Sequence, residues 1–339
     1  MSIKRAYLKN GLILLHILFA IIGVYIYLFN YRLSENILVQ KALNKQLILA
    51  KAGSYSVENL LKNVQNQLAS FIFSFAKINE SFQIDQNATR AEFIGYMQRA
   101  QLPVNGIALY DEKGTLTIIE NRQDIRIGEN QDFSQTALIK WSKNPANKDK
   151  TFISTPYIGT VGASAGKIII IVAKPIYFGN VYKGTLAIRL LVNDFINAFI
   201  FPLISSNDED TFVLDRYGVL IAGNKKLINQ NLFTYAQHQN WSLHKDFTNK
   251  LKLALRTDSI QTTWTFQNPK EKPKLLLVGV SKIDIPNTDK DIYMIVTTSK
   301  EGIAASLRPL LGYGLVWLGF GVFTTILGGL IVILLRTSE

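Results

Sequence analysis

The sequence predicts an α+β protein in which a long N-terminal helix carries two tandem antiparallel-sheet modules, with a transmembrane helix at each end of the chain. Two runs of residues, 11–30 and 310–335, contain no formally charged side chain. The stretch after the first run has helical spacing, and two successive groups of predicted strands share one turn sequence. Together these observations predict a membrane-anchored chain with a folded segment between its two anchors.

The two apolar runs are each long enough to cross a membrane, because about 20 residues at a rise of about 1.5 Å span a hydrocarbon layer of about 30 Å. For the first run the alternative is a cleaved signal peptide, but it exceeds the usual core of about 7–15 residues. Lys4, Arg5 and Lys9 precede the first run and Arg336 follows the second. By the positive-inside rule, we expect a two-pass inner-membrane protein with both termini in the cytoplasm and a periplasmic or extracellular middle segment.

A single long helix is expected after the first span, because no proline occurs between residues 31 and 78. Apolar side chains recur there in steps of three and four, at Val57, Leu60, Leu61, Val64, Leu68 and Phe71. Gly53 and Ser54 form the predicted weak point, since helix propensity drops there. The apolar stripe either packs on a sheet only or also pairs with a second copy of the chain.

A parallel homodimer is the expected assembly. Besides the stripe on the long helix, small residues recur every four positions in the second span, at Gly321, Thr325 and Gly329. Such residues allow two helix backbones to approach closely in lipid.

The first module begins with a predicted hairpin, formed by strands at 106–110 and 115–119 around a turn from Asp111 to Gly114. Further strands are expected at 152–157, 167–173 and 182–191. The middle one of these three is apolar on both faces, which predicts an interior strand. We expect the strands to form a meandering antiparallel sheet backed by the long helix.

The second module repeats this order after residue 207. Its strands are expected at 211–215, 219–221, 275–280 and 292–297, and a turn from Asp215 to Gly218 matches the turn of the first hairpin. The pattern indicates an internal structural repeat of roughly 100 residues. The predicted division is a cytoplasmic N-terminus (1–10), a first transmembrane helix (11–31), a long stalk helix (32–80), a first module (81–200), a second module (201–308), a second transmembrane helix (309–335) and a cytoplasmic tail (336–339).

Composition and motifs argue against several function classes. The net charge is +12, but Lys and Arg are dispersed, so we expect no nucleic-acid partner. The basic surface either faces anionic lipid or simply solvates the domain. The chain has no cysteine, and His16, His238 and His244 fit no metal-binding spacing, so no metal site or cofactor is expected. The run Gly-Ala-Ser-Ala-Gly at 162–166 fits a hydrolase nucleophile motif, but a strand follows it where that motif needs a helix. We therefore expect no catalytic residues and no enzyme activity in this chain.

Six segments carry a family resemblance, and they are 107–114, 128–134, 154–157, 170–176 with Gly179, 184–189 and 212–218. In their order, spacing and position between two spans, they resemble the double Cache family. The PAS-like domains of that family sense extracellular ligands in bacterial chemoreceptors, histidine kinases and cyclic-di-GMP enzymes. The resemblance covers about residues 31–308. It implies that the first module is membrane-distal and holds the ligand, and that the second is membrane-proximal and relays the change to the second span.

The resemblance also implies a position for the ligand. In the amino-acid-binding branch of the family, an Arg-x-Trp-Tyr motif holds the ligand carboxylate, and an aspartate on the last strand holds the amino group. The corresponding positions here are Gln131, Phe133, Ser134 and Arg189, and only Tyr157 keeps the identity found in that branch. The resemblance therefore implies either a ligand whose charge pattern differs from that of an α-amino acid, or an unused pocket.

The strand at 184–191 predicts the surroundings of Arg189. Alternation places Leu186, Ile188 and Leu190 on one face and Thr185, Ala187 and Arg189 on the other. A guanidinium is suited to a carboxylate, so we expect a small organic anion held by Arg189 and Tyr157. The alternative is that Arg189 pairs with a structural acid or extends to solvent.

These expectations together indicate the sensory part of a transmembrane receptor of the chemoreceptor, histidine kinase or diguanylate cyclase type. Its output region is expected beyond Glu339 or on another polypeptide. The alternative is a membrane-bound binding or scaffold protein that partners another membrane protein.

Overall fold

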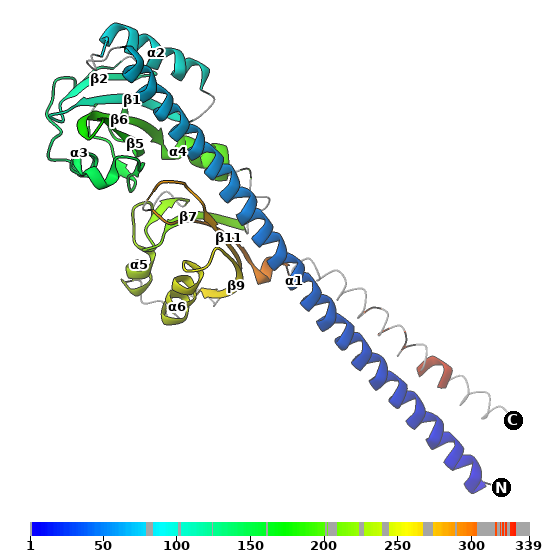
Figure 1. Cartoon of the computed structure of the whole chain (residues 1–339). Coiled ribbons are helices and arrows are strands. Elements are labelled where there is room, and N and C mark those ends of the chain that lie inside the picture. Colours follow the sequence, from blue (N-terminus) through cyan, green and yellow to red (C-terminus); the bar gives the residue numbers. More distant parts are fainter. Residues whose placement is uncertain are drawn as a thin grey trace. The chain divides into compact units, whose positions relative to one another are not determined.

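The chain is described by a computed structural model with an α+β architecture (Figure 1). The residues described are 2–78, 84–100, 103–123, 125–160, 162–200, 202, 209–223, 227–238, 244–266, 274–288, 290–303, 316, 319, 321, 323 and 326–329. The chain divides into two compact units, one formed by Met1–Leu43 with Ser299–Glu339 and the other by Asn44–Thr298. The second unit contains both predicted sheets.

The first unit contains the start of helix α1 (Ser2–Ile78) and an ion pair of 2.8 Å between the Lys300 Nζ and Glu35 Oε1 atoms. Within the described part of the chain, no helix combines the length and the apolar character that crossing a bilayer requires. The side chains of 2–17 and most of the predicted second span, with Thr325, lie outside the described residues. The two membrane crossings therefore stay predictions.

Helix α1 confirms the long helix predicted from the sequence. The predicted apolar stripe is buried along its whole length, in one core cluster with residues of both sheets. The helix runs through Gly53 and Ser54 without a break, so the weak point predicted there is wrong. The Ser54 hydroxyl donates to the Lys51 carbonyl oxygen at 2.9 Å and lies 2.9 Å from the Ser281 hydroxyl, and both bonds hold this turn in place.

The first module contains the strands β1 (Val104–Asp111), β2 (Leu116–Asn121), β3 (Phe152–Ile153), β4 (Tyr157–Ile158), β5 (Ile168–Phe178) and β6 (Val181–Leu191), with helices α2 (Gln86–Arg99) and α3 (Ala137–Lys143). The strand order is β2-β1-β6-β5-β3, and β4 also pairs with β5. The predicted interior position of β5 is confirmed. The predicted meander is wrong, because the first strand pairs with the last one, β6, and such a long-range pairing leaves no local signal in the sequence.

The second module contains β7 (Glu209–Asp215), β8 (Leu220–Ala222), β9 (Ser259–Phe266), β10 (Lys274–Ile283) and β11 (Ile292–Ser299), with helices α5 (Leu232–His238) and α6 (His244–Ala254). Its order, β8-β7-β11-β10-β9, is that of the first sheet. The predicted internal repeat is therefore confirmed. Short helical turns, α4 (Val192–Phe195) and η3 (Ile196–Ile200), follow β6.

The repeat extends to the hydrogen bonds of the two turns. The Asp111 Oδ1 atom accepts from the backbone N–H groups of Lys113, Gly114 and Thr115 at 2.8–2.9 Å. Asp215 Oδ1 accepts in the same way, from Tyr217 and Val219 at 2.9 Å. The final glycines have φ of +98° at Gly114 and +81° at Gly218, a conformation that other L-residues avoid. The Asp-x-x-Gly pattern therefore marks a real turn in each module.

Helix α1 and strand β10 approach each other most closely at Gly279. A Cβ atom at this position would lie 2.3 Å from the backbone C and O atoms of Gln46. Next to this contact, the Lys45 Nζ atom lies 2.6 Å from Oε1 of the buried Glu209. Backbone packing and a polar pair thus both fix the helix against the second sheet.

Candidate functional site

The two faces of the first sheet differ in character. Leu186, Ile188 and Leu190 of β6 belong to the large core cluster that includes α1, as the predicted alternation requires. On the opposite face, Ala187 pairs with Ala108 of β1 and Ala173 of β5, and these three small side chains belong to a separate apolar cluster under α3. Arg189 follows Ala187 by two positions and therefore lies on this second face.

Arg189 is a mostly enclosed cation without a counter-charge. Its Nη1 atom donates to the Ser164 hydroxyl oxygen at 3.4 Å, and its Nε atom is buried without a hydrogen-bond partner. Among the described residues, no carboxylate forms an ion pair with it, so the alternative of a structural acid partner finds no support. Burial lowers the pKa of the guanidinium, yet arginine stays protonated in proteins. An unpaired buried charge is costly, and a bound anion would remove that cost.

Two tyrosines lie within electrostatic range of this cation. Tyr157 of β4 pairs with Ile169 of β5 and is 39% exposed, and Tyr110 of β1 is 8% exposed. Burial raises the pKa of the Tyr157 hydroxyl to about 12, and the nearby Tyr110 adds to the rise. Burial also raises the pKa of Tyr110. Neither hydroxyl has a hydrogen-bond partner among the described residues, so both are protonated at neutral pH and free to donate to a ligand.

Ser164 and Asn105 complete the polar cluster. The Asn105 Nδ2 atom donates to the Ser164 hydroxyl oxygen at 2.9 Å, and Ser164 is 1% exposed. Ser164 ends the short helix η2 (Gly162–Ser164), which lies between β4 and β5, so a strand follows this segment as expected from the sequence. Its hydrogen-bond partners are an amide and a guanidinium, neither of which can act as a general base here, so it is not arranged as a nucleophile.

A cluster of ion pairs around Arg90 fixes the loop after β2, which lies near this site. On α2, the Arg90 Nη1 atom lies 2.6 Å from Glu120 Oε1 of β2, and its Nη2 atom lies 2.8 Å from Glu129 Oε1. The Ile119 N–H donates to the same Glu129 atom at 3.0 Å. The backbone of the following loop reaches η2, because a Cβ on Gly162 would lie 3.4 Å from the Ile127 oxygen. The Arg90 cluster thus fixes the loop after β2.

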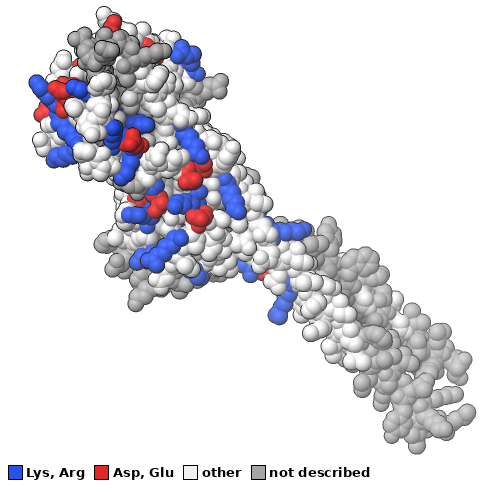
Figure 2. Space-filling model, viewed as in Figure 1, with Lys and Arg blue, Asp and Glu red and all other residues white. Residues whose placement is uncertain are grey.

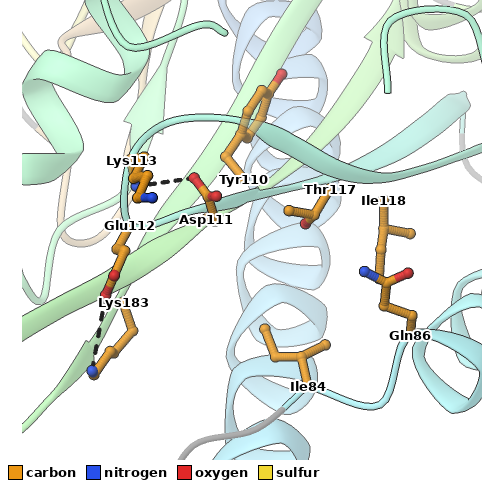
Figure 3. A pocket seen from close by; sticks show the side chains of 9 residues that line it. All are labelled: Ile84, Gln86, Tyr110, Asp111, Glu112, Lys113, Thr117, Ile118 and Lys183. Atoms are coloured by element: carbon orange, nitrogen blue, oxygen red, sulfur yellow. Dashed lines mark hydrogen bonds and ion pairs between the residues drawn. The ribbon is translucent and has the colours of Figure 1, made fainter. Parts of the chain in front are cut away.

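A hollow of about 390 Å³ lies at the hairpin between β1 and β2 (Figure 3). Tyr110, Asp111, Glu112, Lys113 and Lys183 line it together with four neighbours. Figure 3 shows the Tyr110 hydroxyl pointing away from Ile84 and Gln86, which lie on the other side of the hairpin. Three of the charged groups at this hollow already have partners, because Asp111 caps the turn and Glu112 lies 4.0 Å from Lys183. We therefore regard the Arg189 cluster, not this hollow, as the candidate ligand site.

Most other charged groups lie at the surface. Figure 2 shows Lys and Arg side chains dispersed among Asp and Glu over the visible face. Among the described residues, no group of three or more His, Asp and Glu side chains could hold a metal ion. Arg189 differs from these surface cations because it is half-buried and its Nε atom is shielded from solvent.

Comparisons with known proteins place this geometry in a known fold. No protein-family model and no curated protein sequence matches the chain. The periplasmic sensory domain of the Campylobacter jejuni chemoreceptor Tlp1 matches at TM-score 0.60 and 12% identity, covering 78% of this chain and 98% of that one. The ligand-binding domain of the Pseudomonas fluorescens chemoreceptor CtaA, in complex with L-alanine, matches at TM-score 0.52 and 15% identity, covering 76% and 97%. This chain has the fold of a chemoreceptor sensory domain.

The sensory-domain fold also occurs within a longer relative. An extracellular ligand-binding receptor from Desulfohalobium retbaense matches at TM-score 0.52 and 14% identity over 74% of this chain. The chain spans 39% of that receptor. At such low identities the likeness is one of fold, and the ligand must be argued from the residues of this chain.

Within the sensory-domain fold, the five predicted site residues separate into two groups. Arg189 and Tyr157 lie within electrostatic range of each other, and Phe133 reaches the site through Tyr110, whose ring centroid lies 5.6 Å away in an edge-on arrangement. No described contact joins Gln131 or Ser134 to these residues.

Gln131 and Ser134 instead have local structural roles. The Gln131 carbonyl accepts from the Leu116 N–H at 3.0 Å, and the Ser134 N–H donates to Asp132 Oδ1 at 2.7 Å. The second module repeats the first of these bonds, from the Leu220 N–H to the Gln230 carbonyl at 2.9 Å. These contacts shape the loop in both modules and need no ligand.

Sequence reasoning did not identify Tyr110, Asn105 and Ser164 as site residues. The signal for Tyr110 was present, because the residues at even positions of the predicted strand at 106–110 share one face. Its pairing opposite Thr185 of β6, two positions before Ala187, depends on long-range strand order and could not be predicted.

Proposed function

We propose that this chain is the small-molecule sensory part of a membrane receptor, and that its ligand is a small organic anion held in the first module by Arg189 and Tyr157. The observation that carries the proposal is the enclosed guanidinium with an unpartnered Nε atom, flanked by two tyrosine hydroxyls. A carboxylate would accept charge-assisted hydrogen bonds from all three groups. The sensory-domain fold supports the same function, since proteins of this fold include ligand-binding domains of chemoreceptors.

The proposal includes the membrane topology predicted from the sequence. Two spans anchor the chain in the inner membrane, with both termini in the cytoplasm, the first module far from the membrane and the second near it. Ligand binding in the first module shifts the second module, and the second span carries that shift to an output region beyond Glu339 or on a partner. Anionic lipid is the proposed surface partner of the basic side chains.

The proposed receptor works as a parallel homodimer. In the second span, Gly321, Thr325 and Gly329 would face a second copy. Replacing Thr325 by Leu should lower the yield of chemical crosslinking between copies in membranes, whereas Thr324→Leu on a neighbouring face should not. An equal yield for both variants would show that the spans do not meet at this stripe.

The ligand site is tested by a thermal-shift screen of organic acids on the full chain. A ligand at about 100 times its dissociation constant adds about 2.7 kcal/mol, which corresponds to roughly 5–10 °C for a folded unit of this size. The shift should vanish in Arg189→Ala and persist in Arg99→Ala, which removes an exposed arginine of α2. A shift that survives Arg189→Ala would move the site elsewhere. A large fall in the unliganded melting temperature of Arg189→Ala would favour a structural role for this residue.

A further inference from the structure

The candidate site carries a positive charge that no negative charge balances among the described residues. Among the described residues, the groups that act electrostatically on Arg189 are Tyr110 and Tyr157, and Arg189 is the charged group that acts on those tyrosines. A bound molecule would therefore meet one fixed positive charge and two neutral hydroxyls. Among the described residues, no negative charge faces the same point.

The nearby carboxylates of the first module are all engaged elsewhere. Asp111 directly follows Tyr110, but its carboxylate accepts from the turn amides (Figure 3). Glu120 and Glu129 are paired with Arg90. Asp132 accepts from the Ser134 N–H, and this bond lowers its pKa. None of them is among the groups that act electrostatically on Arg189.

We propose that this site selects monocarboxylates without an ammonium group over the α-amino acids of the same shape, with Tyr110 as a ligand-contacting residue beside Arg189 and Tyr157. The inference rests on the proposed function and names its ligand class.

The selectivity follows because an ammonium group would lack a negatively charged partner in this site. Its three N–H donors would lose water and meet a guanidinium and tyrosine hydroxyls, with no carboxylate to accept from them. An ammonium beside a guanidinium, with only neutral hydroxyl oxygens to accept from it, is less stable there than in water, and the carboxylate end of an amino acid must offset this cost. A hydroxyl, a keto oxygen or a hydrogen atom at the same carbon carries no such cost, and an oxygen there can accept from Tyr110 or Tyr157.

The other neighbours of Arg189 on the sheet suit an uncharged ligand body. Ile171 pairs opposite Arg189, and the Phe133 ring packs edge-on against Tyr110. The neighbouring row of Ala108, Ala187 and Ala173 is fully buried and apolar. Because Arg189 is the single cation of the site and these neighbours are apolar, a second carboxylate on the ligand would also lack a partner.

The test uses isothermal titration calorimetry on the full chain with three matched pairs of probes: L-lactate and L-alanine, L-2-hydroxyisocaproate and L-leucine, and L-phenyllactate and L-phenylalanine. L-Malate serves as the dianion. The hydroxy acid should bind at least tenfold more tightly than its amino acid in at least one pair, a difference of about 1.4 kcal/mol. The selectivity would be overturned by an amino acid that binds as tightly as its hydroxy acid in a pair where either binds, or by a preference below tenfold in every pair.

Substitutions of Tyr110 and Tyr157 test whether their hydroxyl groups bind the ligand. Tyr110→Phe and Tyr157→Phe each remove one hydroxyl and should weaken binding of the preferred hydroxy acid by about tenfold or more, because each hydroxyl donates to a charged carboxylate. Arg99→Ala should leave the affinity unchanged. An unchanged affinity in Tyr110→Phe would remove Tyr110 from the site.

The experiments distinguish an error in the proposed ligand class from an error in the proposed sensor function. If no hydroxy acid binds while L-malate or an amino acid gives a shift that Arg189→Ala abolishes, the ligand class is wrong and the site stands. If no probe in the panel or the wider acid screen binds in an Arg189-dependent manner, both are wrong.

Discussion

The buried cluster around Arg90 gives the sharpest test of how the first module is held together. Replacing Arg90 by Met keeps a helix-compatible side chain of similar length but removes the partner of Glu120 and Glu129. The Glu120 side chain is 1% exposed, so its carboxylate cannot recover its hydration without a change in packing. The substitution therefore leaves a buried negative charge whose closest cation is gone.

The size of the effect follows from these contacts. Breaking a buried ion pair on one side costs about 3–5 kcal/mol. Arg126, whose Nε atom lies 3.5 Å from Glu120 Oε1, stays in place, so we expect the lower end of that range, about 3 kcal/mol. For a cooperative unit of this size, the melting temperature should fall by roughly 6–12 °C.

Differential scanning calorimetry of the full chain measures this change. Arg99→Met is the matched control, because it makes the same replacement at an exposed position of the same helix and should shift the transition by less than about 1 kcal/mol. Replacing Glu120 by Gln in the Arg90→Met background should recover part of the loss, since it removes the buried charge. Equal melting temperatures for Arg90→Met and Arg99→Met would refute the claim that the cluster is buried and ionic.

Three further predictions concern other parts of the chain. Gly279→Ala places a Cβ against the backbone of Gln46 and should cost about 3 kcal/mol or more in chemical denaturation; a smaller loss would mean that α1 does not lie on β10. Burial raises the pKa values of Tyr157 and Tyr182 to about 12. Their protonated hydroxyls therefore stabilise the fold fully below pH 10, and this stabilisation is lost as pH rises through 12. In an absorbance titration, Tyr157→Phe and Tyr182→Phe should each lack one tyrosine ionisation near pH 12. A cysteine at Asn207 should react with an impermeant thiol reagent from outside the inner membrane, and reaction only after membrane rupture would invert the topology.

Local patterns predicted much of the fold. The buried stripe of α1, the two Asp-x-x-Gly turns and the interior strand β5 each follow from spacing or turn chemistry within a few residues. The same strand order in both modules confirmed the repeat that these turns indicated.

The errors arose where distant residues decide the structure. Strand β9 was not predicted, because its polar sequence around Thr262 and Thr263 lacks a continuous apolar face and its position depends on pairing with β10. Gly53 lowers helix propensity, but close packing of α1 against the second sheet overrides this local preference.

The candidate site could be predicted only in part for the same reason. Alternation along one strand placed Arg189 on the correct face, as its pairing with Gly106 and Ile171 confirms. Whether Arg189 meets an acid depends on loops distant in sequence, including the η2 turn that supplies Ser164. Local spacing gives no information on such a contact.

The most direct test of the proposed sensor is a crystal structure of the chain with the organic acid that gives the largest thermal shift. The account predicts the ligand carboxylate within about 2.7–2.9 Å of the Arg189 Nε atom, with at least one of the Tyr110 and Tyr157 hydroxyls donating to the ligand. A ligand bound in the second module or at the hairpin hollow, with the Arg189 Nε atom still unpartnered, would contradict it.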